Sequence, residues 1–321
     1  MRVILLGPQR RPTVDAVVRS LGLDGPVATI TAGWQEREAD DGELSRRLDG
    51  RDTALELYQR WLDVQDRDPV YAAGERTLQG VLAELQDTYL LRLDYALQAV
   101  YALARRADSR PGAQALAAAV AAVRELDRTH LRQVNGVRGE FFERLPPHDR
   151  PIIAEHRAAV ARLISESAAV VVAGGHVNVL AYVLHLFNVA AALNATAPEP
   201  PASPAASPVA GRPVIAWSAG AMALTDRIVL FHDRAPQGPG HPEVYGSGLS
   251  VLRDVVLLPH ARTRLLLDNP PRMAVFARRF DPARCVLLDN GTRIDTDDAG
   301  SWPPGTRVLA EDGRVTALEA A

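Results

Sequence analysis

The chain lacks lysine altogether, and all 36 of its basic residues are arginine. Catalysis through a Schiff base needs a lysine amine, so lysine-based covalent chemistry is excluded. Cysteine is almost as scarce, because Cys285 is the only one in the sequence. An internal disulfide and a cysteine-rich zinc site are therefore excluded as well.

Long apolar runs and a strong charge of either sign are also missing. No segment approaches the ~20 apolar residues of a membrane-spanning helix, and residues 1–7 are too short a run for a signal peptide. The net charge of −3 gives no indication of a nucleic-acid or membrane partner. We therefore expect a cytoplasmic protein.

Motifs that hold metals or phosphates are absent too. No His-Glu-x-x-His pattern occurs, and Gly7-Pro8-Gln9, after the first apolar run, is too poor in glycine to cradle a phosphate. We expect neither a metal nor a cofactor.

Short apolar runs alternate with helical patterns at both ends of the chain. The 321 residues, 47% of them hydrophobic, suffice for a sizeable core. Strands at 3–6 and 27–31 around a helix at 13–21 predict the opening of a doubly wound sheet. The alternation resumes later, so we predict an α/β core with a mostly parallel sheet, formed by 1–34 and 168–321.

The second part of this core supplies the remaining predicted elements. A helix is expected over 177–193, and the Pro/Ala/Ser-rich stretch 196–211 predicts a flexible loop. Strands are expected at 169–172, 213–217, 228–231, 255–258, 286–288 and 307–309.

The intervening residues, 35–167, predict a large all-α insertion, because apolar residues recur there with the 3.6-residue period of a helix. Asp68-Pro69 and Asp149-Arg150-Pro151 are typical helix starts. We expect four helices, at about 42–66, 69–107, 111–143 and 150–167. Scaffolding, a lid over an active site and formation of a homodimer all stay open as roles of this insertion.

The most informative segment is Val214–Met222, in which an apolar run stops at Ser218 and small residues follow. Small neighbours allow the sharp strand-to-helix turn that exposes a nucleophilic hydroxyl. An ordinary turn with a helix-capping serine has the same pattern. A nucleophilic serine needs a base, and His260, at the end of a predicted strand, is preferred to His232.

An acyl-transfer site also needs N–H donors for the oxyanion. The backbone of Ala219, directly after the serine, is one candidate. Gly174-Gly175 is the second, because it follows a predicted strand, precedes a helix and allows close backbone approach. We assign the predicted oxyanion hole to Gly175 and Ala219.

Together these residues resemble the peptidase E/cyanophycinase family, peptidase family S51. The resemblance covers 168–295 well and 1–34 loosely, and it rests on Trp217-Ser218-Ala219-Gly220-Ala221-Met222, the strand–Gly174-Gly175–helix unit, and Gly248-Leu249 through His260-Ala261-Arg262-Thr263-Arg264. It implies a class I glutamine-amidotransferase-like fold and a serine hydrolase that cleaves peptide bonds next to an acidic residue. Ser218 is then the nucleophile and His260 the base.

The third member of the triad departs from the family pattern. Asp233 lies where the family has a carboxylate, but the late Asp-Glu-Gly-Thr-like motif reads Asp289-Asn290-Gly291-Thr292 here. Asn290 thus replaces the glutamate that can orient the histidine, and an amide cannot stabilise an imidazolium by charge. Either Asp233 or Asp289 compensates, or the triad is weakened; both aspartates are also typical turn residues.

The expected substrate is a small peptide or amide. His176 follows Gly-Gly where the family usually has Asn or Gln, at a position that faces the substrate. Arg262 and Arg264 could bind a substrate carboxylate or form structural ion pairs. Gly174 and Trp217 complete the predicted substrate site.

Two functions therefore stay open. The first is a serine peptidase or amidase that works through a Ser-His acyl-enzyme and resembles an exopeptidase. The second is a hydrolase-like binding or scaffold protein with weakened chemistry, which Asn290 and the large insertion favour. Glutamine amidotransfer is not expected, because it needs a cysteine at the turn and Cys285 lies far downstream.

Overall fold

A six-stranded sheet forms the centre of the computed structural model, which describes residues 1–9, 13–195, 212–234 and 240–319. Its strand order is β10-β1-β5-β4-β2-β3, and every pairing is parallel except that of β10 with β1. The strands are β1 (Arg2–Leu6), β2 (Val27–Ile30), β3 (Asp52–Ala54), β4 (Ala169–Val172), β5 (Val214–Trp217) and β10 (Arg293–Asp297). This confirms the predicted α/β class with a mostly parallel central sheet.

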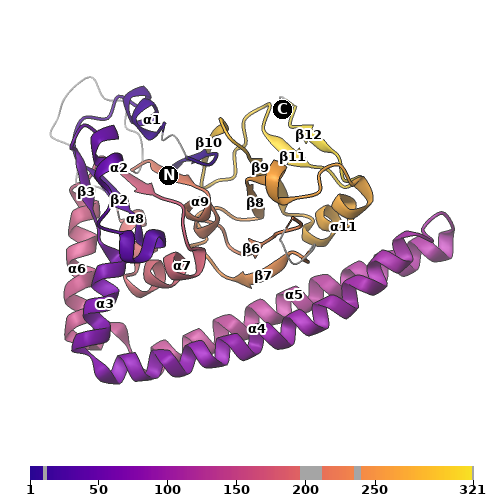
Figure 1. Cartoon of the computed structure of the whole chain (residues 1–321), viewed down its shortest axis with the longest axis horizontal. Helices are drawn as coiled ribbons and strands as arrows, with labels where there is room; N and C mark the ends of the chain where they lie inside the picture. The colour runs from indigo at the N-terminus through magenta and orange to yellow at the C-terminus, as the bar shows by residue number, and fades with distance from the viewer. Residues whose placement is uncertain (10–12, 196–211, 235–239, 320–321) are drawn as a thin grey trace.

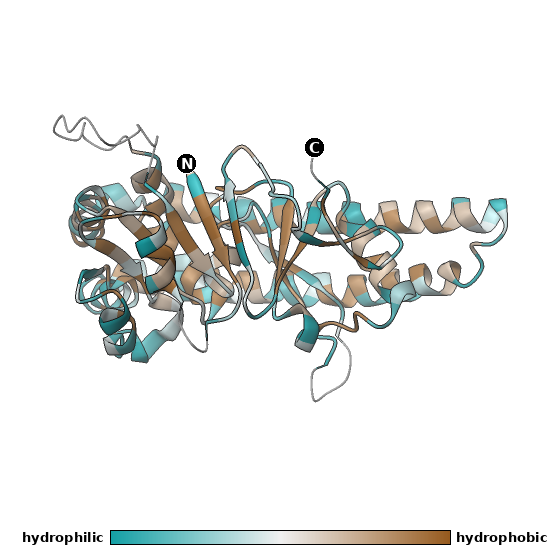
Figure 2. Ribbon diagram, turned by 90° about the horizontal axis from the view of Figure 1, so that it is seen from above, coloured by the Kyte–Doolittle hydropathy of each residue, from teal (hydrophilic) through white to brown (hydrophobic). Residues whose placement is uncertain are grey.

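Helices cover both faces of this sheet, which explains why its inner strands read as continuous apolar runs. Ile4 and Leu6 of β1 pack with α1 (Val14–Ser20) and α2 (Gly42–Arg47). Val3 and Leu5 point the opposite way, toward α3 (Leu57–Arg67), α6 (Pro151–Ser165) and α7 (Val177–Leu186). Figure 2 shows that strands in the middle of the molecule are largely apolar.

A second, four-stranded sheet lies beside the first and has the order β12-β11-β9-β8 (Figure 1). Strands β8 (Val255–Pro259) and β9 (Arg284–Leu288) are parallel and joined through α11 (Pro270–Phe280), while β11 (Arg307–Leu309) and β12 (Val315–Ala317) are antiparallel additions. The predicted strands at 255–258, 286–288 and 307–309 therefore exist, but outside the central sheet. Strands β6 (Ile228–Leu230) and β7 (Glu243–Gly246) form a separate antiparallel pair.

Two long helices, α4 (Pro69–Ala104) and α5 (Arg110–Arg144), form an antiparallel hairpin along one side of both sheets (Figure 1). Each helix begins with a side-chain cap followed by proline: Asp68 accepts a hydrogen bond from the Tyr71 amide, and Ser109 from the Gly112 amide. The helices predicted at 69–107, 111–143 and 150–167 are thus confirmed, the last one as α6.

The predicted helix 42–66 is wrong, because the chain forms α2, strand β3 and α3 over this range. Asp49 and Gly50 adopt left-handed backbone angles, φ 56° and 69°, which end α2. Residues 52–54 then pair with β2 at the edge of the central sheet. The segment predicted as an all-α insertion, 35–167, is consequently not helical throughout.

The predicted helix 177–193 is interrupted as well. Asn188 has a left-handed backbone with φ 54°, so α7 ends at Leu186 and α8 runs over Val189–Asn194. The loop predicted at 196–211 lies outside the described residues. Among the helices that the structure describes, none has the length and apolar character to cross a bilayer.

A buried ion pair attaches the hairpin to the body of the molecule. The Arg279 guanidinium of α11 donates to both carboxylate oxygens of Asp127 on α5, at 2.7 Å each. The Tyr89 hydroxyl of α4 donates to Asp127 at 2.8 Å and accepts from Arg279 at 2.9 Å and from the Val244 amide of β7 at 3.0 Å. This network fixes both hairpin helices against α11 and β7.

Candidate active site

Ser218 occupies a sharp turn between β5 and the short helix α9 (Ala219–Ala223). Its backbone angles are φ 52° and ψ −124°, a strained conformation for a residue with a Cβ. Two residues later, a Cβ on Gly220 would lie 2.2 Å from the carbonyl oxygen of Val172, so this position requires glycine. The predicted strand–serine–helix turn is therefore present, with the strain that such turns carry.

The Gly174-Gly175 turn lies directly against Ser218. Parallel pairing of β4 with β5 aligns Val172 with Ala216, so the two turns leave the same edge of the sheet. A Cβ on Gly174 would lie 2.8 Å from the Ser218 Cβ, and Gly175 has φ 138°, which an L-residue rarely adopts. Both glycines are thus needed for the chain to pass this close to the serine.

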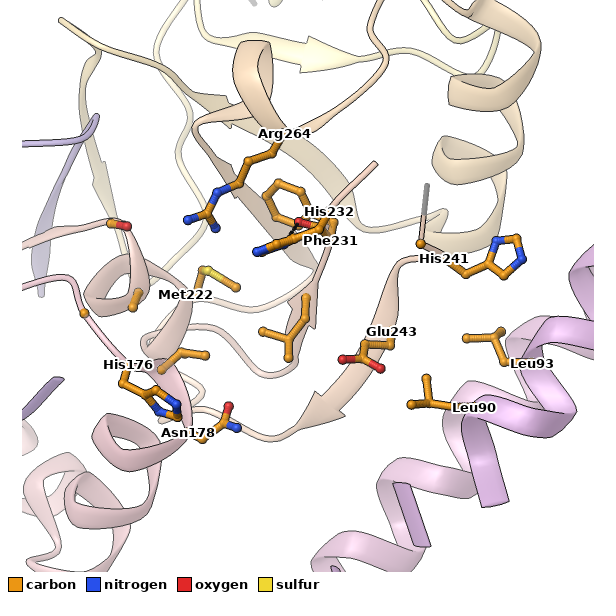
Figure 3. Close-up of a pocket in the computed structure, with 16 residues that line it drawn as sticks. Leu90, Leu93, His176, Asn178, Met222, Phe231, His232, His241, Glu243 and Arg264 are labelled. Atoms are coloured by element: carbon orange, nitrogen blue, oxygen red, sulfur yellow. Dashed lines mark hydrogen bonds between the residues drawn. The ribbon is translucent and has the colours of Figure 1, made fainter. Parts of the chain in front are cut away.

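A cleft of about 660 Å³ opens in front of these turns (Figure 3). The described residues that line it come from five parts of the chain: the serine turn and α9, the β4–α7 turn, the β6–β7 region, Arg264 four residues after His260, and α4 of the hairpin. The lining residues are Leu90, Leu93, Gly175, His176, Val177, Asn178, Ser218, Ala219, Met222, Leu230, Phe231, His232, Gly240, His241, Glu243 and Arg264. The predicted oxyanion-hole residues therefore share a cleft with Ser218.

The structure brings His232 to this cleft. In Figure 3 its ring lies between Arg264 and Met222, and its Nδ1 is 2.5 Å from the Phe231 carbonyl oxygen. When Nδ1–H donates to that oxygen, Nε2 is left as the acceptor. Loss of hydration lowers the pKa of His232, and the Arg264 charge lowers it further while Asp233 opposes the shift.

His260, the preferred base, is half-buried at the N-cap of α10 (Ala261–Arg264), with a left-handed φ of 59°. Its amide donates to the Leu288 carbonyl of β9 at 3.0 Å. It is not among the described residues that line the cleft, although Arg264, four positions later, is. His176 does line the cleft, at the start of α7.

Asp233 is turned away from the cleft and bound elsewhere. One carboxylate oxygen accepts from Arg272 Nη2 at 2.6 Å, and the other from the Leu266 amide at 3.1 Å. The side chain is 1% exposed. These contacts give Asp233 a structural role, holding the segment after β6 against α11.

Asp289 and Asn290 follow β9. Asp289 accepts a hydrogen bond at 2.9 Å from the amide of Arg262, the second residue of α10, and its carboxylate is also 3.4 Å from Arg307 Nη1. It therefore orders the turn that begins at His260. Asn290 is exposed at the start of the 289–292 turn, which is closed by a 3.0 Å bond from the Thr292 amide to the Asp289 carbonyl.

The two predicted substrate arginines separate in the structure. The Arg262 side chain is 68% exposed and lies 3.6 Å from Asp289. Arg262 therefore forms a structural ion pair, which was the alternative to binding a substrate carboxylate. Arg264 lines the cleft, and burial lowers its pKa. Trp217 is buried among apolar side chains behind the serine turn and is not among the described lining residues.

Sequence reasoning missed the contributions of the hairpin and of β7. Leu90 and Leu93 of α4 form one wall, and Glu243 of β7 points into the cleft (Figure 3). Glu243 accepts a 3.1 Å hydrogen bond from Gln86 of α4, and burial raises the pKa of its carboxyl. No local motif marks these residues, because tertiary packing alone brings α4 to the cleft.

No cluster of three or more metal-ligating side chains occurs within the described parts of the chain. Comparison with models of known protein families gives no match, and none of the curated proteins shows significant similarity.

Proposed function

We propose that this protein is a serine hydrolase of the peptidase E/cyanophycinase type, with a class I glutamine-amidotransferase-like core, that cleaves a small peptide or amide. The observation that carries the proposal is the strained Ser218 turn packed against Gly174-Gly175 at the floor of a cleft. Strain of this kind persists where the surrounding structure enforces it, and it concentrates at functional sites.

The proposed reaction proceeds through an acyl-enzyme. The Ser218 hydroxyl attacks the amide carbonyl carbon while a histidine accepts its proton, and the N–H groups of Ala219 and Gly175 bind the resulting oxyanion. Collapse of the tetrahedral intermediate breaks the C–N bond, and the leaving amine takes the proton from the histidine. Water then attacks the ester by the same steps and releases the acid.

Two histidines compete for the role of base. The family resemblance assigns it to His260, whereas His232 lines the cleft and has its Nδ1 next to a backbone carbonyl. The lowered pKa of His232 favours the neutral ring that a base requires. Asp289, which accepts a hydrogen bond from the Arg262 amide two residues after His260, is the candidate carboxylate for the first assignment.

The charges of the cleft suggest the chemistry of its substrate. Arg264 supplies a cation and Glu243 a carboxyl group, and they reach the cleft from α10 and β7 (Figure 3). An amino acid or short peptide carries groups that complement both. An acidic substrate bound through Arg264 agrees with the cleavage next to acidic residues that the resemblance implies.

The alternative function is a binding protein with weakened chemistry. The observation that favours it is the engagement of Asp233 by Arg272 and of Asp289 by two arginines, together with the exposure of Asn290. An amide in place of the carboxylate that stabilises the imidazolium by charge costs several kcal/mol of transition-state stabilisation, of the order of 10⁴ in rate.

Labelling with a fluorophosphonate probe separates the two functions. We expect the wild type to be labelled and Ser218→Ala not to be. Ser250→Ala is the matched control, because Ser250 also has a positive φ, 55°, and is not among the described residues of the cleft. Absence of labelling in a folded wild type would contradict the hydrolase and favour the binding protein.

The same assay identifies the base. We expect loss of labelling, by ~10²-fold or more in rate, for one of His260→Ala and His232→Ala and near-normal labelling for the other. Retention of the wild-type rate in both variants would exclude both assignments.

A further inference from the structure

A second cavity, of about 190 Å³, adjoins the cleft. Asn178, at the start of α7, lines both, and Figure 3 shows it beside His176 at the edge of the cleft. The other described residues around the second cavity come from α3, α4, α5, α7 and β7, and they include Trp61, Glu75, Arg138, Tyr182 and Tyr245.

Arg138 of α5 is the unusual member of this set. Its Nε is buried and has no hydrogen-bond partner within the described chain. Burial lowers the pKa of Arg138, and the phenols of Tyr245 and Tyr182 oppose this shift. The Arg138 charge in turn lowers the pKa of His185. Buried arginines are normally paired with carboxylates, because an unpaired buried charge costs several kcal/mol.

The carboxyl of Glu75 reaches the same cavity but does not pair with Arg138. It accepts hydrogen bonds from Trp61 Nε1 at 3.0 Å and from Gln65 Nε2 at 2.5 Å. On the opposite side, the Arg138 guanidinium lies against Gly246 of β7, where a Cβ would be only 3.1 Å from Nη1. The packing therefore holds the guanidinium in place beside an open volume.

Asn178 supplies a second unsatisfied group. Its Oδ1 is buried and has no hydrogen-bond partner in the part of the chain that the structure describes. The half-buried Arg138 guanidinium, whose Nε lacks a partner in the described chain, and the unpartnered amide oxygen of Asn178 thus border one cavity. A ligand that offers a carboxylate to the first and an N–H to the second would satisfy both.

We propose that Arg138 and Asn178 form a carboxylate-binding subsite, so that the ligand of the cleft carries an acidic group that extends past Asn178 into the second cavity. The link to catalysis rests on the proposed function, whereas binding of the carboxylate does not. The hairpin then has a specific role: it supplies the cation of this subsite through α5 and a wall of the cleft through α4.

Calorimetric titration with succinate, and with neutral succinamide for comparison, tests the subsite. Titrations use the wild type and Ser218→Ala, so that the result is independent of any chemistry. We expect succinate to bind more tightly than succinamide, and Arg138→Met to weaken succinate at least tenfold. Arg132→Met is the matched control, because Arg132 lies on the same helix with a 65% exposed side chain paired to Glu125. The affinity of this variant for succinate should equal that of the wild type.

Asn178→Asp provides a second variant should Arg138→Met not fold. It places a carboxylate beside Arg138, and we expect it also to weaken succinate at least tenfold through repulsion and competition for the guanidinium. Equal affinities in wild type, Arg138→Met and Asn178→Asp would overturn the proposal, as would the absence of succinate binding. Loss of binding in Arg264→Met alone would place the anion in the cleft instead. If the protein binds succinate through Arg138 but is not labelled at Ser218, the proposal of the subsite stands and the proposal of a serine hydrolase fails.

Discussion

At the scale of single residues, the site depends on the absence of side chains around Ser218. Gly174 faces the serine Cβ, Gly175 faces the Gly33 carbonyl, and Gly220 faces the Val172 carbonyl at distances that exclude a methyl group. Three backbone segments can therefore converge on one hydroxyl. The strained φ of Ser218 is maintained by this packing rather than by local preference.

Gly220→Ala tests this packing. The added Cβ would lie 2.2 Å from a carbonyl oxygen, so we expect a loss of ~1–3 kcal/mol in the free energy of unfolding and a large loss of probe labelling. Gly80→Ala is the control, because Gly80 lies in α4 with open space at its Cβ position. That substitution should raise the stability by ~0.5–1 kcal/mol. Chemical denaturation measures both, and equal effects would refute the packing argument.

The residues of the serine turn were predictable because their signal is local. A buried apolar run, a serine and three small residues are contiguous in the sequence, and Gly-Gly follows another such run. Glu243, Asn178 and Arg138 have no such signal. Each becomes a candidate only through a position that long-range packing creates: a cleft wall for Glu243, and a shared cavity for Asn178 and Arg138.

At the scale of elements, buried strands and capped helices were predicted well, and short edge strands were not. The strands over 169–172 and 214–217 are continuous apolar runs, and α4 and α5 have caps followed by proline. The three residues of strand β3 are all half-buried and show no alternation of buried and exposed side chains, so only the pairing with β2 defines this strand. The Asp49-Gly50 pair, a typical turn signal, marked the break that the helical prediction overlooked.

The attachment of the hairpin makes a prediction at this scale. Asp127→Ala leaves the Arg279 guanidinium, whose side chain is 2% exposed, without a counterion. We expect a loss of ~3–5 kcal/mol in the free energy of unfolding, because an unpaired buried charge is costly. Hydrogen exchange should also increase in α4 around Leu90 and Leu93, since Tyr89 loses its acceptor.

Glu125→Ala is the matched control for this variant. Glu125 lies on the same helix and pairs with Arg128 and Arg132, but all three side chains are more than half exposed. Surface pairs of this kind contribute little to stability. A loss in Asp127→Ala no larger than that in Glu125→Ala would mean that the buried pair does not hold the hairpin in place.

At the scale of the whole molecule, the hairpin runs along both sheets and helps to form the cleft between them. It packs on α11 and β7, and it contributes Leu90 and Leu93 to the cleft and Arg138 to the second cavity. The homodimer predicted through this region stays a prediction; Leu91 and Tyr95 on α4 are 61% and 66% exposed.

The same interface contributes to the pH dependence of stability. His130 of α5 stacks on Tyr89 with ring centroids 4.0 Å apart, its Nε2 is 2.9 Å from Gln86 Oε1, and burial lowers its pKa to about 4 despite the nearby Asp127. Because the unfolded histidine titrates near 6.5, the unfolded state binds more protons between pH 6.5 and 4. The free energy of unfolding therefore falls as the pH is lowered through this window, by at most about 1.4 kcal/mol per pH unit.

Carboxyls with raised pKa values act in the opposite direction and must be separated from this effect. Burial raises the pKa of Glu38, Glu75 and Glu243, so the folded state binds more protons than the unfolded state above pH 4.5. The stability that these groups contribute is lost as the pH rises through their folded pKa values. His130→Phe keeps an aromatic ring on Tyr89 but removes the titration. Denaturation at several pH values should therefore show a smaller decrease in stability from pH 6.5 to 4 in His130→Phe than in wild type. Parallel curves for the two proteins would mean that His130 is protonated as readily in the folded chain as in the unfolded one, which is incompatible with a neutral, buried ring between the two hairpin helices.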